Sequence, residues 1–300
     1  MKKLNYFFMC GLMLSASLSF MGCSSDDEED GAPKTDNYYI TTNDGERLLL
    51  TRVGNYSFEY DSKGLLSSCN VYGDKYDISF AQNKITSDYG YTATFKLNGS
   101  GYISSITFLY EGDDTNTGTT NFAYDGSGRL VSVSGNYSDD GDKGSFTCKL
   151  TYNNGKLVKT VYEGESVEDG ERFTEKETSV VNYDNNAMVN ILGQCSKNMV
   201  EIALDVDEIG NALFLTGYLG KPSSYFPTSV DCEYSDSEGY NESDTESYRY
   251  TFNSNGTLAT EDGMSYSYSN MPTVGDDKTR SVQTPSPRKH HKRHGFRLIK

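Results

Sequence analysis

Apolar and polar residues alternate in short runs along most of the chain, and Asp, Asn and Gly separate the runs. In the first clear instance Phe58 and Tyr60 are two positions apart, and Asp61 and Gly64 follow before Leu66. Side chains two positions apart lie on one face of a strand, while Asp followed three residues later by Gly favours a tight turn. The pattern therefore predicts a β-hairpin.

The same unit recurs along the chain. Matching stretches cover residues 58–66, 95–103 and 122–130, and shorter copies follow at 150–157, 181–184 and 250–258. Two further hairpins are predicted over residues 38–50 and 202–215, the second turning at 207–210. No stretch shows a sustained helical period, although residues 217–228 could contain a helical turn. We expect an all-β fold, a single domain in which the hairpins form a curled antiparallel meander.

The first residues have the pattern of a secretory signal. An apolar run over residues 6–21 follows two lysines and is too short for a membrane-spanning helix. The run ends in Gly22 and Cys23, which resembles the lipobox of bacterial lipoproteins, with Phe20 in place of the usual Leu. The resemblance implies that residues 1–22 are a signal peptide and that Cys23 carries the lipid. The alternative is an ordinary secretory signal cut nearby.

Two segments differ from the repeats, which occupy residues 37–268. Residues 23–36 include an acidic run, which repels itself and should form a solvated tether. Such a run resembles the surface-export signal of Bacteroidota lipoproteins, although a plain flexible spacer would look the same. Residues 269–300 carry eight basic residues and no strand period, so we expect a disordered basic tail.

The Tyr-Asp turns resemble a known family. Tyr124 and Asp125, followed by Gly128, Arg129 and Leu130, match the signature of the YD repeats of Rhs-type proteins. Taken with the lipobox, the chain is similar to Bacteroidota outer-membrane lipoproteins of unknown function that carry such hairpin repeats. The resemblance implies a long antiparallel meander and an outer-membrane location, with the cell-surface side favoured over the periplasmic side. It implies no activity.

Composition narrows the function without defining it. The chain has 43 Asp and Glu against 27 Lys and Arg, for a formal net charge of −16, so its general field should repel nucleic acid. All three histidines lie within residues 290–294, so the body lacks the His of a Ser-His-Asp triad, a Cys-His pair or an imidazole metal site. We expect a protein that is not an enzyme. The alternative is a glycan hydrolase that uses two carboxylates.

Calcium is the remaining cofactor to consider. Residues 114–118, 140–144 and 205–210 each place two possible oxygen ligands near a glycine. None of these stretches completes an EF-hand loop, which needs further ligands and a distal Glu. Solvated turns explain the same residues, so we expect no metal and no other cofactor.

The 24 tyrosines offer the candidates for ligand contact. Most should lie in the core, because an antiparallel meander packs aromatic side chains against cross-strand partners. Tyrosines in turns are not obliged to be buried, and the candidates are Tyr89, Tyr91, Tyr225 and Tyr240. The predicted function is non-catalytic binding of a glycan, peptide or protein, beside a membrane reached through the lipid anchor. A purely structural, adhesin-like module is a further alternative.

Four cysteines remain once the signal peptide and the lipidated residue are set aside: Cys69, Cys148, Cys195 and Cys232. An exported location permits disulfides, and four cysteines allow three pairings. Cys69 and Cys148 fall at apolar strand positions, however. This placement favours free buried thiols over bridges by a narrow margin.

Overall fold

The computed structural model describes residues 38–110, 113–139, 141–168, 170–185, 187–203 and 208–272. The predicted signal peptide, Cys23, the acidic tether and nearly all of the basic tail lie outside these residues. All three possible calcium stretches are also only partly described. No helix in the described ranges is long and apolar enough to cross a membrane.

Strands dominate the described residues, which confirms the predicted all-β class. The elements are β1 (Ile40–Thr41), β2 (Arg47–Val53), β3 (Tyr56–Tyr60), β4 (Leu66–Val71), β5 (Asp74–Ser79), β6 (Lys84–Ser87), β7 (Tyr91–Leu97), β8 (Ile103–Tyr110), β9 (Asp113–Tyr124), β10 (Leu130–Asp139), β11 (Asp142–Asn153), β12 (Lys156–Glu168), β13 (Glu171–Asn182), α1 (Lys197–Ala203), α2 (Glu208–Leu215), β14 (Ser229–Asp236), β15 (Asn241–Ser247), β16 (Tyr250–Phe252), β17 (Leu258–Glu261) and β18 (Met264–Asn270).

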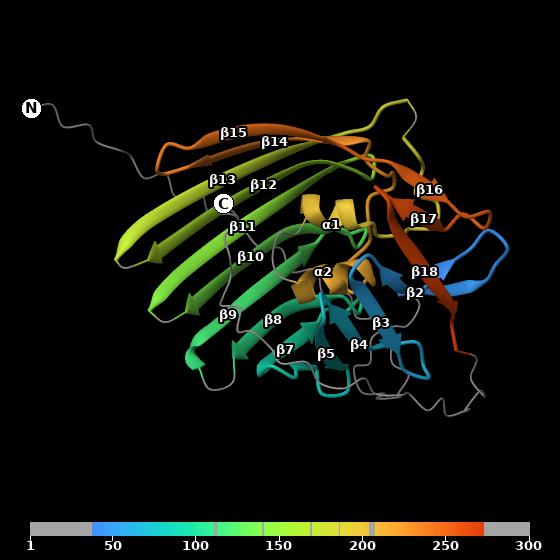
Figure 1. Cartoon of the computed structure of the whole chain (residues 1–300), viewed down its shortest axis with the longest axis horizontal. Helices are drawn as coiled ribbons and strands as arrows, with labels where there is room; N and C mark the ends of the chain where they lie inside the picture. The colour runs from blue at the N-terminus through green and yellow to red at the C-terminus, as the bar shows by residue number, and fades with distance from the viewer. Residues whose placement is uncertain are drawn as a thin grey trace, which may run out of the picture. The chain divides into compact units, whose positions relative to one another are not determined.

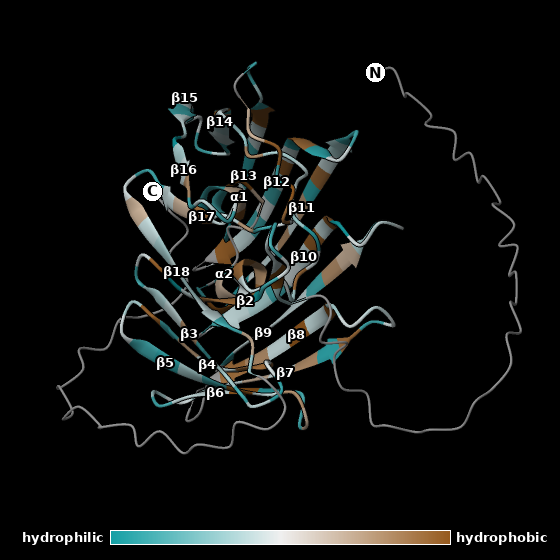
Figure 2. Ribbon diagram, turned by 90° about the vertical axis from the view of Figure 1, so that its right-hand side faces the viewer, coloured by the Kyte–Doolittle hydropathy of each residue, from teal (hydrophilic) through white to brown (hydrophobic). Residues whose placement is uncertain are grey.

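One open antiparallel sheet runs through these strands, largely in chain order (Figure 1). Each strand from β2 to β15 pairs with the next, β18 pairs with β2 on one side and β17 on the other, and β16 pairs with β17. The sheet curls around α1 and α2, as Figure 1 shows. Along the strands, hydrophobic segments alternate with polar ones (Figure 2). The curled meander of hairpins is therefore confirmed.

The predicted turns share one geometry. The Asp61 side chain accepts hydrogen bonds from the amides of Lys63 (2.8 Å) and Leu65 (2.9 Å), which holds the loop closed. Gly64 has a φ of +80°, a left-handed conformation in which a side chain would be strained. The repeat motif thus specifies the turn through one acceptor and one glycine.

The same pair of contacts recurs in three other turns. Asn98 accepts from the second and fourth amides that follow it, and so do Asp125 and Asp236. The turn at Asp236 was missed in the sequence, although Gly239 follows it at the same spacing. No apolar residue restarts the alternation after Gly239, so the match to the other repeats was incomplete.

In four places a tyrosine ties the chain to an earlier strand, and three of these tyrosines belong to the repeat motif, whereas Tyr268 lies in β18. Each ring packs against the core, and each hydroxyl donates to a backbone carbonyl across the fold. The pairs are Tyr60 with Leu50 (2.6 Å), Tyr124 with Ile103, Tyr183 with Leu157 (2.9 Å) and Tyr268 with Leu258 (3.1 Å). A buried tyrosine hydroxyl needs such a partner, so the motif also sets the spacing between hairpins.

Residues 183–228 form an insert that leaves the sheet between β13 and β14 and contains both helices. The predicted hairpin over residues 202–215 is therefore wrong. Ile209, Ala212 and Leu213 are all buried, because α2 lies inside the curl of the sheet. A helix that is buried on most of its surface has no polar face, so its sequence shows no helical period.

The insert accepts hydrogen bonds from the repeats. The strand register shifts beside the first apolar residue after each turn, which opens the ladder there. The amide of that residue then donates to the insert in four repeats. The pairs are Leu66 with Tyr218 Oη (2.9 Å), Ile103 with the Tyr218 carbonyl (3.0 Å), Leu157 with Ser223 Oγ (3.3 Å) and Leu258 with Gln194 Oε1 (2.8 Å). Because an unpaired buried amide is costly, these contacts fix the insert against the turns.

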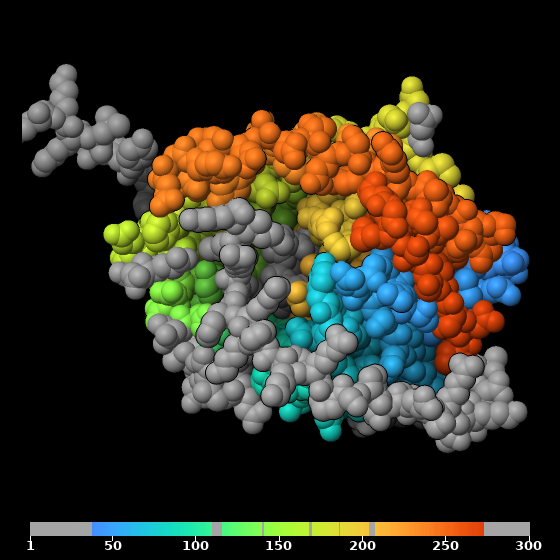
Figure 3. Space-filling model, viewed as in Figure 1, coloured from blue at the N-terminus to red at the C-terminus, as the bar shows by residue number. Residues whose placement is uncertain are grey.

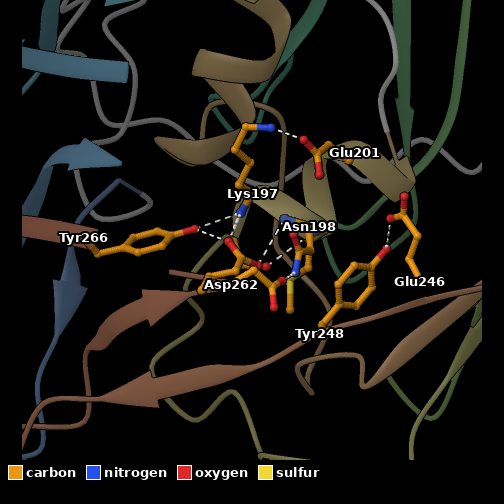
Figure 4. A network of polar contacts seen from close by, with 10 residues as sticks. Lys197, Asn198, Glu201, Glu246, Tyr248, Asp262 and Tyr266 are labelled. Atoms are coloured by element: carbon orange, nitrogen blue, oxygen red, sulfur yellow. Dashed lines mark hydrogen bonds and ion pairs between the residues drawn. The ribbon is translucent and has the colours of Figure 1, made fainter. Parts of the chain in front are cut away.

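A fully buried carboxylate, that of Glu261 in β17, caps the first helix of the insert. It accepts hydrogen bonds from the amides of Lys197 (2.8 Å) and Asn198 (3.1 Å) and from the hydroxyl of Tyr266. Figure 4 shows Lys197, Asn198 and Tyr266 close together at the start of α1. A carboxylate at this end is favourable, because the first amides of a helix have no partner within the helix.

We expect the stability that Glu261 contributes to depend on pH. Burial raises the pKa of Glu261 above its ordinary value of 4.5, although its hydrogen bonds oppose this. The folded state therefore binds the proton more tightly than the unfolded state, and wild-type stability falls as pH rises through the raised pKa. Glu261→Gln does not titrate, so wild type should lose stability relative to this variant in urea unfolding as pH rises above the ordinary glutamate pKa of 4.5. A constant difference would mean that the carboxyl has its ordinary pKa.

Candidate functional site

A cavity of about 310 Å³ lies where the insert meets the repeat turns. Tyr38 and Tyr39 contribute to one wall, and Tyr102 and Arg129, which follow two of the turns, contribute to another. Residues 190–195, 215–217 and 220–224 of the insert, together with Tyr268 of strand β18, also line it. Figure 3 shows part of the insert at the molecular surface, between the β14–β15 hairpin and the strands β2–β5.

The charge of the cavity is opposite to that of the chain. Two cationic residues, Arg129 and Lys221, line it, whereas no Asp or Glu is among the described lining residues. The chain as a whole has 43 acidic residues. The cavity is thus a local region of positive charge on an acidic protein, where an anionic group would be favoured over a cationic one.

Most hydrogen-bonding capacity of Arg129 is unused by the described residues. Its Nη2 donates to Ser224 Oγ at 3.4 Å, and its Nη1 lies 3.9 Å from a carboxylate oxygen of Asp125. Its Nε is buried without a hydrogen-bond partner in the described part of the chain. A guanidinium has five N–H donors, so the side chain could still bind a ligand with two or more acceptors.

Backbone contacts between the insert and a repeat turn place both cations at the cavity. The amide of Lys221 donates to the carbonyl of Gly128 (2.8 Å), and Arg129 and Lys221 form a parallel bridge. The Lys221 side chain forms no ion pair with any described residue. The backbone contacts between the insert and the repeat turn therefore place Lys221 at the cavity.

Two further groups of the lining, the Tyr102 hydroxyl and the Cys195 thiol, have raised pKa values. Burial raises the pKa of the Tyr102 hydroxyl and raises that of the Cys195 thiol to about 12, so both groups are protonated at neutral pH. A protonated thiol is a poor nucleophile. No cluster of three His, Cys, Asp or Glu side chains that could bind a metal occurs in the described ranges.

The four tyrosines predicted to contact a ligand do not come together. Tyr240 is 53% exposed at the β14–β15 turn, and its hydroxyl donates to Glu242 (2.7 Å). Tyr89 is 40% exposed and contacts Tyr76. Tyr225 lies in the insert, directly after the cavity residue Ser224. None of these three tyrosines is among the described residues that line the cavity, so the predicted ligand contact at them is an untested alternative to the cavity.

Tyr91 does not lie in a turn, so the reason for choosing it was wrong. It begins strand β7 and is only 4% exposed. Its ring packs against Phe108 (centroids 6.1 Å apart) and Tyr76 (5.7 Å). The residues that do line the cavity, Arg129 and Lys221, were not proposed as ligand contacts. Arg129 was recognised only as part of the repeat motif, and the sequence around Lys221 contains no signal for a site.

The four cysteines are free thiols, and three of them, Cys69, Cys148 and Cys195, are buried. This confirms the predicted burial of Cys69 and Cys148. Burial raises the pKa of each buried thiol to about 12. Cys232 is partly exposed and lies 3.4 Å from the hydroxyl of Ser179.

We expect thiol reactivity to follow this burial. In the folded protein at neutral pH, only Cys232 should react at a measurable rate with a water-soluble disulfide reagent, because a thiolate must form and be reached. All four thiols should react after unfolding in denaturant. A count of the released chromophore checks both states, and a Cys232→Ser variant should remove the native reaction. Rapid native reaction of two or more thiols would contradict the structure.

The fold and the cavity define a class of protein: an all-β protein in which one open antiparallel sheet encloses an insert and leaves a cavity beside it. The chain belongs to the family described as a domain of unknown function (DUF4595) with porin-like fold, whose model matches residues 51–260. No curated protein matches the sequence.

Two solved structures are similar to this chain. One is a porin-like protein from Bacteroides uniformis, 17% identical, which matches over 77% of this chain and 94% of its own, with a TM-score of 0.49. The other is a porin-like protein from Bacteroides vulgatus, 16% identical, which matches over 73% of this chain and 98% of its own, with a TM-score of 0.48.

Proposed function

We propose that the protein is a non-catalytic binding module whose ligand site is the cavity between the insert and the repeat turns. The observation that carries this proposal is the set of unused polar groups in a cavity of about 310 Å³. Ligand pockets are concave and combine apolar walls with a few polar groups, and this one places Arg129 and Lys221 among tyrosine rings.

We further propose that the module is exported and lipid-anchored at the outer membrane, facing the cell exterior. The lysines before the apolar run, the Gly22–Cys23 junction and the acidic run that follows support this placement. The shared turn geometry of Asp61 and Asp125 supports a relationship of the hairpins to YD repeats.

The anchor is tested by labelling with a fatty acid. Cells that express the wild-type protein should incorporate the label, and cells that express Cys23→Ala should not. Protease added to intact cells should then remove the body if it faces outward. Label in the Cys23→Ala variant would exclude the anchor, and full protection from protease would place the body in the periplasm.

The binding site is tested with the purified body on a glycan and peptide array. For any ligand found, Lys221→Trp should abolish binding, because the exposed Lys221 borders the cavity and a large ring there would fill it. Tyr240→Ala, at the opposite end of the long strands, should leave binding unchanged. The reverse result would move the site to the β14–β15 turn.

The same experiment separates binding from catalysis. Bound compounds are incubated with the protein and the products are analysed. Recovery of intact ligand is the expected result, whereas cleavage of a glycan would favour the carboxylate-dependent hydrolase. Failure of the array to yield any ligand would favour a purely structural module.

A further inference from the structure

We propose that the cavity binds a small ligand through an oxyanion, a carboxylate or a phosphate, placed between Arg129 and Lys221. This inference rests on the proposed function, because it names the chemistry of the ligand at the same site. It makes the charge of the ligand, rather than its overall shape, the main determinant of binding.

The first support is the state of the Arg129 guanidinium. Its only hydrogen bond to a described residue is the long one to Ser224 (3.4 Å), and its Nε is buried without a partner there. A planar guanidinium binds carboxylates and phosphates through two parallel hydrogen bonds. An oxyanion in the cavity would therefore supply acceptors that the described residues do not.

The Asp125 carboxylate forms a long ion pair with this cation but no hydrogen bond. Asp125 lies 3.9 Å from Nη1 of Arg129, beyond hydrogen-bond distance. Its other oxygen, Oδ1, accepts hydrogen bonds from the amides of Ser127 (2.8 Å) and Arg129 (2.9 Å), so the turn keeps this carboxylate in place. The Arg129 side chain is 22% exposed, which leaves it accessible from the cavity.

The second support is Lys221, which comes from the insert and not from a repeat. It lines the same cavity as Arg129 and is held next to it by the bridge between the two backbones. Two cations that line one cavity repel each other, and an anion bound in that cavity would offset the repulsion. No acidic side chain among the described lining residues performs that role.

Cavity size and walls restrict the rest of the ligand. Ligand pockets of proteins usually enclose about 300–1,000 Å³, so this cavity is at the small end and suits roughly one ring. The rings of Tyr39 and Tyr102 provide apolar surface beside the cations. An acidic monosaccharide or a sugar phosphate has this combination of one ring and one oxyanion.

The test compares ligands that differ in charge but share one ring. Glucuronate, glucose 6-phosphate and glucose are titrated into the chain from residue 24 to residue 300, and dissociation constants are measured by ligand-observed NMR. At least one of the two anions should bind roughly tenfold more tightly than glucose, since hydrogen bonds to charged groups are about twice as strong as neutral ones. Whichever of the two anions has the lower dissociation constant shows whether the carboxylate or the phosphate is the preferred group.

Variants assign the effect to the two cations. Lys221→Gln should weaken the binding of the anion by about five- to tenfold and leave glucose unaffected, because an exposed side chain can be changed without disturbing the fold. Arg129→Gln should weaken the binding of the anion more than Lys221→Gln does. Lys63→Gln removes an exposed lysine from an equivalent turn that does not line the cavity, so it should change neither affinity.

Three results would overturn the proposed ligand class. These are equal affinity for glucose and both anions, absence of binding by both anions, and anion binding that survives Lys221→Gln and Arg129→Gln together. In each case the cavity would still be supported as a binding site if a ligand found on the array bound to wild type and not to Lys221→Trp. If Lys221→Trp also left the binding of the array ligand unchanged, the proposed function itself would be wrong.

Discussion

Tyr218→Ala should lower the free energy of unfolding by about 3–5 kcal/mol, the range for removing a large aromatic side chain from a core. Tyr218 is fully buried in the insert. Its ring stacks between Tyr38 (centroids 3.9 Å apart) and Phe80 (4.7 Å), and its hydroxyl accepts the amide hydrogen of Leu66 (2.9 Å). The substitution removes both the packing and the acceptor, and urea unfolding measures the loss.

Two controls separate these contributions. Tyr218→Phe keeps the ring and leaves the Leu66 amide without its acceptor, so it should cost about 1–3 kcal/mol. Tyr240→Ala removes an exposed tyrosine and should cost no more than about 0.5 kcal/mol. If Tyr218→Ala were as mild as Tyr240→Ala, the insert would not be part of the core.

Gly220→Ala should destabilise the fold by about 2–4 kcal/mol, through backbone strain and a collision together. Gly220 has a φ of +99°, which L residues rarely adopt. A Cβ there would lie 2.8 Å from the carbonyl oxygen of Gly128 and 2.9 Å from the ring of Tyr124. Because the insert and the repeat turn touch at this point, they would have to separate.

Two other glycines serve as matched controls for that variant. Gly239→Ala carries the conformational strain alone, since its φ is +89° and no heavy atom lies within 4 Å of the added Cβ. Gly126→Ala carries neither effect and should be nearly neutral. The expected order of destabilisation is Gly220, then Gly239, then Gly126. Equal losses at Gly220 and Gly239 would mean that the collision is relieved at no cost.

The sheet could be predicted from the sequence because its information is local. Asp61 and Gly64 specify a turn by themselves, and the aromatic residues before them mark one face of a strand. Repetition of this unit implies neighbouring hairpins and hence a meander. Cys69 was predicted to be buried for the same reason, since it occupies an apolar position of the repeat.

The insert could not be predicted in this way, because its form depends on what surrounds it. Ile209 and Leu213 belong to a helix that lies inside the curl of the sheet, so no polar face reveals its period. The apolar runs on either side of residues 207–210 resemble two strands when read alone. Only the enclosing sheet makes a short buried helix favourable at this place.

The candidate site depends on the same long-range contacts. Arg129 belongs to a repeat and Lys221 to the insert, and they meet because the insert donates a backbone hydrogen bond to Gly128. Nothing in the sequence near either residue indicates the other. The turn tyrosines, by contrast, were chosen on exposure alone, and Tyr91 shows that position next to a turn does not ensure exposure.

The most direct test of the ligand cavity is a crystal structure of the protein with the compound that binds it most tightly. The expected result is a ligand in the cavity between the insert and the repeat turns, with polar atoms within hydrogen-bond distance of Arg129 and Lys221. A ligand held elsewhere, at Tyr240 or on the long strands, with no ligand in the cavity would contradict the assignment.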